Sequence, residues 1–115
     1  MPLLQLHTSV VVPEAKRAAL LRKLSKLVAE GISKPEAYVM IALREGPMSM
    51  SGDLGPAAFV DLRSIGGLSP AVNKRLMSQL CPLLQQELGV PPARIFANFT
   101  DVPPGSWGHD GDTFG

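Results

Sequence analysis

Residues 20–28 read Leu-Leu-Arg-Lys-Leu-Ser-Lys-Leu-Val, and residues 76–84 read Leu-Met-Ser-Gln-Leu-Cys-Pro-Leu-Leu. In both stretches apolar residues stand at positions i, i+4, i+7 and i+8, which is the spacing of one face of an α-helix. The two stretches lie 56 residues apart, from 20 to 76, and these apolar positions coincide without a gap. Each stretch therefore predicts one long amphipathic helix, and the pair indicates an internal repeat.

The repeat extends into the segments on either side of these helices. With the same shift, Leu4 falls on Val60 and Val39 falls on Ile95. The flanking segments are short and rich in apolar residues, which favours strands. The chain thus predicts two tandem βαβ units, in repeats of roughly 2–44 and 58–100. The predicted elements are strand 2–7, helix 14–30, strand 38–44, strand 58–64, helix 70–88 and strand 94–99.

A few residues mark where the helices begin, end or bend. Gly31 is predicted to end the first helix. Ser69-Pro70 provides an N-cap followed by proline at the first position of the second helix. Pro82 stands in the middle of that helix, where proline removes a backbone hydrogen bond, so a kink is predicted there.

Each predicted helix is long enough to connect two parallel strands of one sheet. Right-handed crossovers place both helices on one face of a four-stranded mixed sheet, an α/β fold (α+β by some schemes). A chain of 115 residues is expected to form a single domain, 1–115. The strands hold more apolar residues than one face uses, which predicts that self-association covers the second face. These residues are Leu3, Val39, Met40, Phe59, Ile95 and Phe96.

Composition and charge argue against several classes of function. Lys and Arg number 11 against 10 Asp and Glu, a net charge of +1, so there is no electrostatic case for nucleic-acid binding. No apolar stretch approaches the roughly 18 residues of a membrane span, and no secretory signal is recognised. Cys81 is alone, and His7 and His109 are too few to predict a metal site. A cytoplasmic protein without a cofactor is expected.

The first two residues suggest a chemical role for the chain terminus. Removal of Met1, which is usual before a small residue such as proline, leaves Pro2 as a terminal secondary amine. An ordinary α-amine titrates near ~7.7–8.0, and burial or a nearby cation lowers that pKa. A neutral amine at physiological pH can accept a proton as a general base. Many chains begin with Met-Pro, so this dipeptide alone does not separate a catalytic terminus from an ordinary one.

Two tandem βαβ units behind an N-terminal proline resemble the tautomerase superfamily, and within it the branch of macrophage migration inhibitory factor and D-dopachrome tautomerase. The motifs that carry this resemblance are spread over nearly the whole chain. They are Met1-Pro2, Lys34-Pro35, Ser64-Ile65-Gly66, Arg94-Ile95-Phe96-Ala97-Asn98-Phe99 and Asp112-Thr113-Phe114. The resemblance implies a homotrimer in which three sheets form a barrel-like assembly, with the helices outside and three active sites at subunit interfaces.

The resemblance also implies an isomerase, a cofactor-independent keto–enol tautomerase of phenylpyruvate-like α-keto acids that also has a possible D-dopachrome tautomerase activity. Pro2 matches the family's catalytic acid–base proline. Lys34 matches the lysine that pairs with the substrate carboxylate, and Ile65 matches a position whose backbone N–H faces the substrate. Phe96 and Asn98 match two further substrate-binding positions, and the family's counterpart of Asn98 comes from the adjacent subunit.

Three departures from the family pattern are visible. Phe96 stands where the cytokine has a tyrosine, so the aromatic wall is kept and a hydroxyl is lost, a change typically worth ~0.5–1.5 kcal/mol. Residues 57–60 lack the Cys-x-x-Cys of the cytokine, so a thiol–disulfide activity is not implied. Trp107 and His109 do not fall simply on the family's C-terminal tryptophan, so the rim of the pocket there is not assigned.

The same resemblance leaves other functions open. A non-catalytic, cytokine-like binding protein would act through receptor or partner contacts, and retention of Met1 would favour this role because it blocks the Pro2 amine. Related chemistry such as hydration or dehalogenation uses the same proline with added arginines and an acid, for which Arg44, Glu45 and Arg63 are available. Export from the cell without a signal peptide also stays open.

Overall fold

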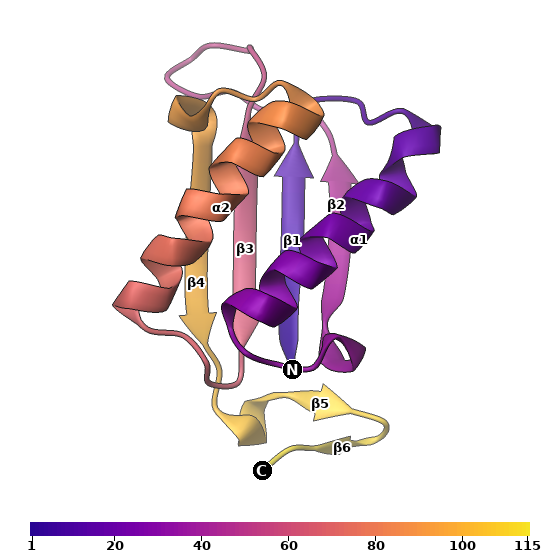
Figure 1. Cartoon of the computed structure of the whole chain (residues 1–115), viewed down its shortest axis with the longest axis vertical. Helices are drawn as coiled ribbons and strands as arrows, with labels where there is room; N and C mark the ends of the chain where they lie inside the picture. Colours follow the sequence, from indigo (N-terminus) through magenta and orange to yellow (C-terminus); the bar gives the residue numbers. More distant parts are fainter.

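A computed structural model describes all 115 residues (Figure 1). The helices are α1 and α2, and six strands and three short 3-10 turns complete the chain. In chain order the main elements are β1 (Pro2–Thr8), α1 (Glu14–Gly31), β2 (Met40–Glu45), β3 (Ala58–Ser64), α2 (Pro70–Leu88), β4 (Ile95–Asp101), β5 (Gly108–His109) and β6 (Asp112–Thr113). The 3-10 turns are Glu36–Tyr38, Pro92–Arg94 and Pro104–Ser106. Neither helix combines the length and the apolar character needed to cross a membrane.

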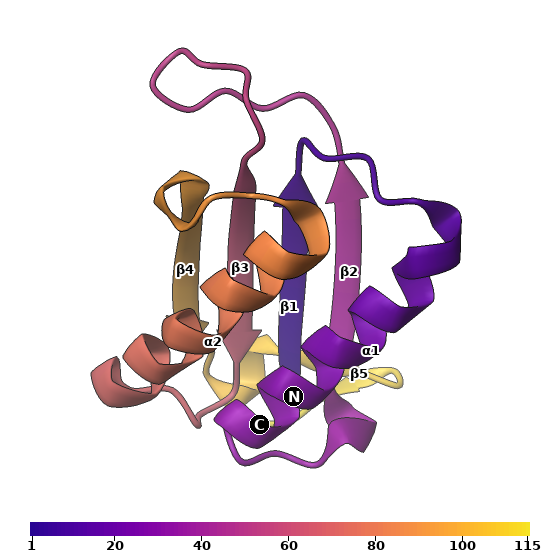
Figure 2. The same ribbon diagram turned by 45° about the horizontal axis from the view of Figure 1, so that its top comes forward.

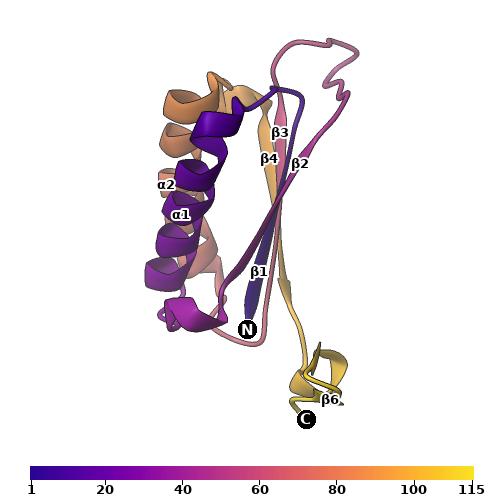
Figure 3. The same ribbon diagram turned by 90° about the vertical axis from the view of Figure 1, so that its right-hand side faces the viewer.

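The four long strands form one mixed sheet in the order β2-β1-β3-β4. Each βαβ unit contributes a parallel pair, β1 with β2 and β3 with β4, and the two units join through the antiparallel pair of β1 and β3. Both helices lie on the same face of this sheet (Figure 3). The predicted fold class is therefore confirmed, together with the parallel pairs and the side on which the helices lie.

The apolar face of each helix packs against the sheet. Leu20, Leu24, Leu76 and Leu80 are all buried, as the repeat predicts. They belong to one core cluster of 15 residues, which also includes Leu4, Leu6, Val60 and Leu62 from the two central strands. Burial of one such side chain is worth about 1.5–3 kcal/mol relative to exposure, so this layer is the main source of stability in the chain.

The second strand begins later than the sequence predicts. Tyr38 does not belong to a strand: it ends the 3-10 turn, and its backbone N–H donates to the Pro35 carbonyl at 3.1 Å. Pairing starts where Leu3 meets Met40, because β1 offers few residues before that point. The consequence is that Tyr38 has an exposed side chain at the end of the sheet instead of a place in the core.

The face of the sheet opposite the helices carries both apolar and polar side chains. Directly paired residues project from the same face, so the register defines three rows across it. The rows are Met40-Leu3-Arg63-Thr100, Ala42-Gln5-Asp61-Asn98 and Arg44-His7-Phe59-Phe96. Of the six apolar strand residues, Ile95 is buried in the core on the helix side and Val39 packs against that core. Leu3, Met40, Phe59 and Phe96 do lie on the open face, among polar neighbours.

The ends of α2 follow the sequence signals. The Ser69 hydroxyl accepts a hydrogen bond from the backbone N–H of Val72 at 3.1 Å, and Gly89 ends the helix in the left-handed region with φ +69°. Pro82 has an exposed side chain, and the helix continues through it to Leu88. The kink predicted at Pro82 stays a prediction.

Gly31 is the last residue of α1 and is buried. A Cβ atom at this position would overlap the side chain of Leu76 on α2, so the two helices approach closely here. We expect Gly31→Ala to lower the free energy of unfolding by about 1–3 kcal/mol, the usual effect of overpacking. Denaturant unfolding at a fixed protein concentration measures this loss.

Gly46 provides the matched control, because it is exposed and a Cβ there would meet no atom within 4 Å. Gly46→Ala should change stability by less than about 0.5 kcal/mol. Equal stabilities for the two variants would contradict the close approach of α1 and α2 at Gly31.

Candidate functional site

A cavity of about 510 Å³ opens at the end of the sheet where β1 begins. Its walls come from three segments far apart in sequence: the first residues, the turn before β2 and the C-terminal hairpin of β5 and β6. Figure 2 shows that hairpin beside the N-terminus. The lining residues are Met1, Pro2, Leu3, Ala37, Tyr38, Val39, Met40, Trp107, Gly108 and His109. The cavity is mainly apolar and contains the start of the chain.

Pro2 is held in place by the strand on its antiparallel side. It is buried and lies opposite Ser64, the last residue of β3. Ser64 is itself fixed, because its hydroxyl donates to the Gly66 carbonyl at 2.7 Å and its carbonyl accepts from the Val102 N–H at 2.9 Å. The position of Pro2 is therefore set by β-sheet pairing.

Lys34 supplies positive charge near the start of the chain. Burial, and then the Lys34 cation, lower the pKa of the Met1 α-amine below its ordinary value. The backbone of Lys34 is anchored at the end of α1, where its N–H donates to the Ala29 carbonyl at 3.0 Å. Its side chain lies beside Gly67, where a Cβ would come within 3.4 Å of Lys34 Cε. The sequence-predicted pair of terminal amine and lysine is thus brought together.

Ile65 follows Ser64 directly and lies at the same end of the sheet as Pro2. Its side chain is half-buried. The next residue, Gly66, has φ +70° and donates its N–H to the Asp101 carboxylate at 2.9 Å. This turn leads the chain away from the sheet immediately beside the Pro2–Ser64 pair, so Ile65 joins Pro2 and Lys34 in one region.

Phe96 and Asn98 are not part of this region within one chain. Phe96 pairs with Phe59, which in turn pairs with His7, five positions along β1 from Pro2. At about 3.3 Å per strand residue this is about 16 Å along the sheet. Asn98 lies in the middle row of the open face, and the Phe96 side chain is 63% exposed. The structure therefore separates these two predicted residues from the other three.

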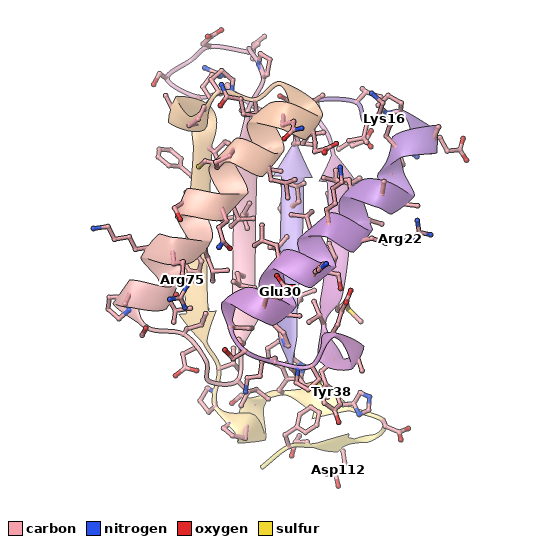
Figure 4. All side chains as sticks on the ribbon, in the orientation of Figure 1. Lys16, Arg22, Glu30, Tyr38, Arg75 and Asp112 are labelled. Carbon is pink, nitrogen blue, oxygen red and sulfur yellow. The ribbon has the colours of Figure 1, made fainter.

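Three ring-bearing side chains that the sequence analysis did not assign to the site also line the cavity. They are Tyr38, Trp107 and His109. Figure 4 shows Tyr38 at the end of the sheet near the C-terminal hairpin. Tyr38 was missed because it was placed in a strand. Trp107 and His109 were noted in the sequence, but they could not be placed because no strand was predicted after residue 99.

The dipeptide Asp110-Gly111 is the sequence feature that could have predicted the hairpin of β5 and β6. Asp110 has φ +50° and Gly111 has φ +84°, and together they form the two-residue turn between β5 and β6. An Asp-Gly pair is typical of such turns. The Phe114 N–H donates to the Trp107 carbonyl at 3.2 Å, and the Phe114 ring stacks on His109 with centroids 5.6 Å apart. These contacts fix the shape of the C-terminal hairpin, of which Trp107, Gly108 and His109 line the cavity.

The arrangement is suited to proton transfer next to a bound anion. A terminal amine with a lowered pKa can be neutral at physiological pH and accept a proton. Lys34 offers a cation for a carboxylate, and the aromatic walls offer apolar contact to a ring. No group of three or more His, Cys, Asp or Glu side chains is arranged to hold a metal ion.

A protein-family model described as macrophage migration inhibitory factor matches residues 1–115. Among curated proteins, a macrophage migration inhibitory factor homolog of Brugia malayi is 38% identical over 99 residues, covering 85% of this chain and 86% of that protein. The macrophage migration inhibitory factor of Xenopus tropicalis is 35% identical over 96 residues, covering 83% of this chain and 84% of that protein.

Solved structures extend the same similarity to the fold. A macrophage migration inhibitory factor homologue from Prochlorococcus marinus has a TM-score of 0.93 and 38% identity, covering 98% of this chain and 99% of that chain. The macrophage migration inhibitory factor from Trichinella spiralis has a TM-score of 0.89 and 32% identity, covering 97% of this chain and 99% of that chain.

Lys34→Ala should raise the pKa of the terminal amine toward its ordinary value, because a nearby cation disfavours the protonated form and its removal relieves that effect. The pH dependence of α-amine arylation, followed by mass spectrometry of the N-terminal peptide, measures this pKa. Lys16→Ala is the matched control, since Lys16 lies at the opposite end of the molecule (Figure 4). An unchanged amine pKa in Lys34→Ala would contradict the assignment of Lys34 as the neighbouring cation.

Proposed function

Because the chain belongs to the macrophage migration inhibitory factor family of the tautomerase superfamily, we propose that it is a cofactor-independent keto–enol tautomerase of phenylpyruvate-like α-keto acids, with Pro2 as the acid–base group. Family membership by itself supports a tautomerase or cytokine-like function in general terms. The observation that carries the finer proposal is the apolar cavity around the chain terminus, in which burial and Lys34 lower the pKa of the amine.

Removal of Met1 is part of this proposal. With Met1 present, Pro2 nitrogen is an amide and carries no free electron pair for a proton. Removal of Met1 turns it into a secondary amine, and it also frees the space that Met1 takes in the cavity. The new amine would lie one residue deeper, at a buried position close to the same lysine, so its pKa should also lie below the ordinary value.

The proposed reaction moves one proton. The substrate carboxylate pairs with Lys34, and the ring of the substrate lies against the aromatic walls. Neutral Pro2 takes the proton from the carbon next to the keto group, the electron pair moves to form the C=C bond, and the carbonyl oxygen gains the negative charge. Protonated Pro2 then returns the proton to that oxygen and gives the enol. The backbone N–H of Ile65 is proposed to face the bound substrate.

We propose in addition that three chains assemble into a barrel-like homotrimer with one site at each interface. Two features of the chain support this assembly. The edge strands β2 and β4 leave one side of their backbone unpaired, which favours pairing with another chain. Exposed Met40 and Phe96 lie at opposite corners of the open face. A neighbouring chain could then supply Phe96 and Asn98 to the site that contains Pro2.

The first test measures phenylpyruvate tautomerisation by absorbance, with protein whose N-terminal mass shows that Met1 is absent. A Met1-retaining preparation is the control and should be inactive. Pro2→Gly should lower kcat/KM by about 10²-fold or more, the usual contribution of a general acid–base group. Lys34→Ala should chiefly raise KM, and the pH at which activity rises should move upward because its amine pKa is higher.

Full activity in Pro2→Gly or in the Met1-retaining form would overturn the role of Pro2. Inactivity of the processed protein toward phenylpyruvate and D-dopachrome, with the fold intact, would instead favour the cytokine-like role, in which the chain acts by binding a partner.

The second test asks whether a site combines residues of two chains. Pro2→Gly and the double variant Phe96→Ala/Asn98→Ala are unfolded and refolded together, then compared with each variant refolded alone. If the site lies between chains, about a quarter of the sites in randomly mixed trimers regain all native residues, so activity should rise well above the mean of the separate variants. Light scattering checks that the mass is three times 12.2 kDa.

No gain of activity on mixing, in samples shown to contain both chains, would place the site within one chain. Wild-type activity in the double variant would remove Phe96 and Asn98 from the site altogether.

A further inference from the structure

A second hollow of about 250 Å³ adjoins the cavity around the chain terminus. Leu3, Trp107 and Gly108 line both spaces, so the two are neighbours across shared side chains. The second hollow is completed by Arg63, Val102 and Ser106. It extends the site past Leu3 toward β3, away from the turn that carries Tyr38. The second hollow adds about 250 Å³ to the space of about 510 Å³ around the chain terminus.

Arg63 is the charged group of this second hollow, and its place is set by the sheet. It lies directly opposite Leu3 in the β1–β3 pair, one position from Pro2 along β1. Such opposed residues have Cβ atoms about 4.5–5.5 Å apart. Arg63 therefore projects from the open face immediately beside the candidate site.

Asp61 holds the guanidinium on one side. Arg63 Nη2 donates to Asp61 Oδ2 at 3.1 Å, and Arg63 Nε lies 3.5 Å from Asp61 Oδ1. The Asp61 side chain is 15% exposed and the Arg63 side chain 52% exposed, so the carboxylate is the inner partner and the guanidinium the outer one. Nη1 has no hydrogen-bond partner in the chain. A guanidinium held this way can still donate through its free edge.

Arg63 is the only lining residue of the two hollows with a Lys, Arg, Asp or Glu side chain, and the Asp61 carboxylate that pairs with it lies outside both linings. Neither lining includes an Asp or Glu side chain. Lys34 influences the amine in the first space, and Arg63 lines the second. A ligand with a single carboxylate can contact one of these cations, and if it pairs with Lys34, the Nη1 edge of Arg63 that Asp61 does not occupy stays without a protein or ligand partner.

We propose that Arg63 is a specificity-determining residue that binds a second anionic group, so that the preferred ligands are planar or enolic acids with two carboxylates, one at each end. This inference rests on the proposed function for its reaction, but the binding preference stands on the two hollows and their cations. Asp61 acts as a positioning residue, because it fixes the orientation of the guanidinium.

The test uses Trp107 as a reporter, because it is the only tryptophan and it lines both hollows. Cinnamate and 4-carboxycinnamate serve as unreactive probes that differ by one carboxylate, and quenching of Trp107 fluorescence gives their Kd values. The processed protein should bind 4-carboxycinnamate roughly tenfold more tightly, the gain of a charge-assisted hydrogen bond reduced by partial exposure. Arg63→Gln should abolish this preference while changing cinnamate binding less than about threefold, and Arg63→Lys should keep part of it.

Arg44→Gln is the matched control, since Arg44 lies on the same open face in the row farthest from Pro2 and should keep the preference. Equal affinity of the wild-type protein for the two probes would overturn the proposal, as would an equal loss for both probes in Arg63→Gln. Turnover of phenylpyruvate is measured separately on the same samples. Absence of phenylpyruvate turnover in the wild-type protein would refute the proposed tautomerase activity. The difference in affinity between the two probes tests the role of Arg63 independently of turnover.

Discussion

Strand β1 is hydrogen-bonded on both edges, to β2 on one side and to β3 on the other. This pairing places the first residues of the chain in the middle of the sheet, where most proteins keep a solvated and mobile terminus. The candidate site depends on it, because a terminal amine becomes a useful base only when it is held in a fixed, poorly hydrated position. The same ladder sets Leu3 opposite Met40 and Arg63, and so defines what surrounds the amine.

The helices on one side of the sheet make this placement stable. Their leucines bury Leu4 and Leu6 of β1 completely, and the resulting core lies next to Pro2 on the same face. The other walls of the site are built at the end of the sheet, from a 3-10 turn and a short hairpin. The helix side of β1 thus carries both the buried leucines and Pro2, whereas Leu3, whose side chain alternates to the open face, lines the cavity beside Pro2.

The open face combines polar and apolar side chains, which suits an assembly whose interface is not wholly apolar. Its middle row holds Gln5, Asp61 and Asn98, and apolar side chains gather in the rows at either end. Polar groups of this kind lose hydration if they are buried without partners, so a neighbouring chain is more easily accommodated at the edges and corners than across the whole face. The separation of Phe96 from Pro2 within one chain agrees with a site shared between chains.

The 56-residue repeat, read from periodicity, was enough to predict both helices, the four long strands, their parallel pairs and the side of the sheet that the helices cover. These follow from local patterns and from the handedness of crossovers, which short-range physics determines. Met1-Pro2 was also recognisable by residue type, and Lys34 by the resemblance to a known family. The sequence did not reveal that Tyr38 leaves the strand, that Ile95 faces the core, or that Trp107, His109 and Arg63 meet near Pro2. Those placements depend on the strand register and on a C-terminal hairpin folded against a distant segment, and only the tertiary structure specifies such contacts.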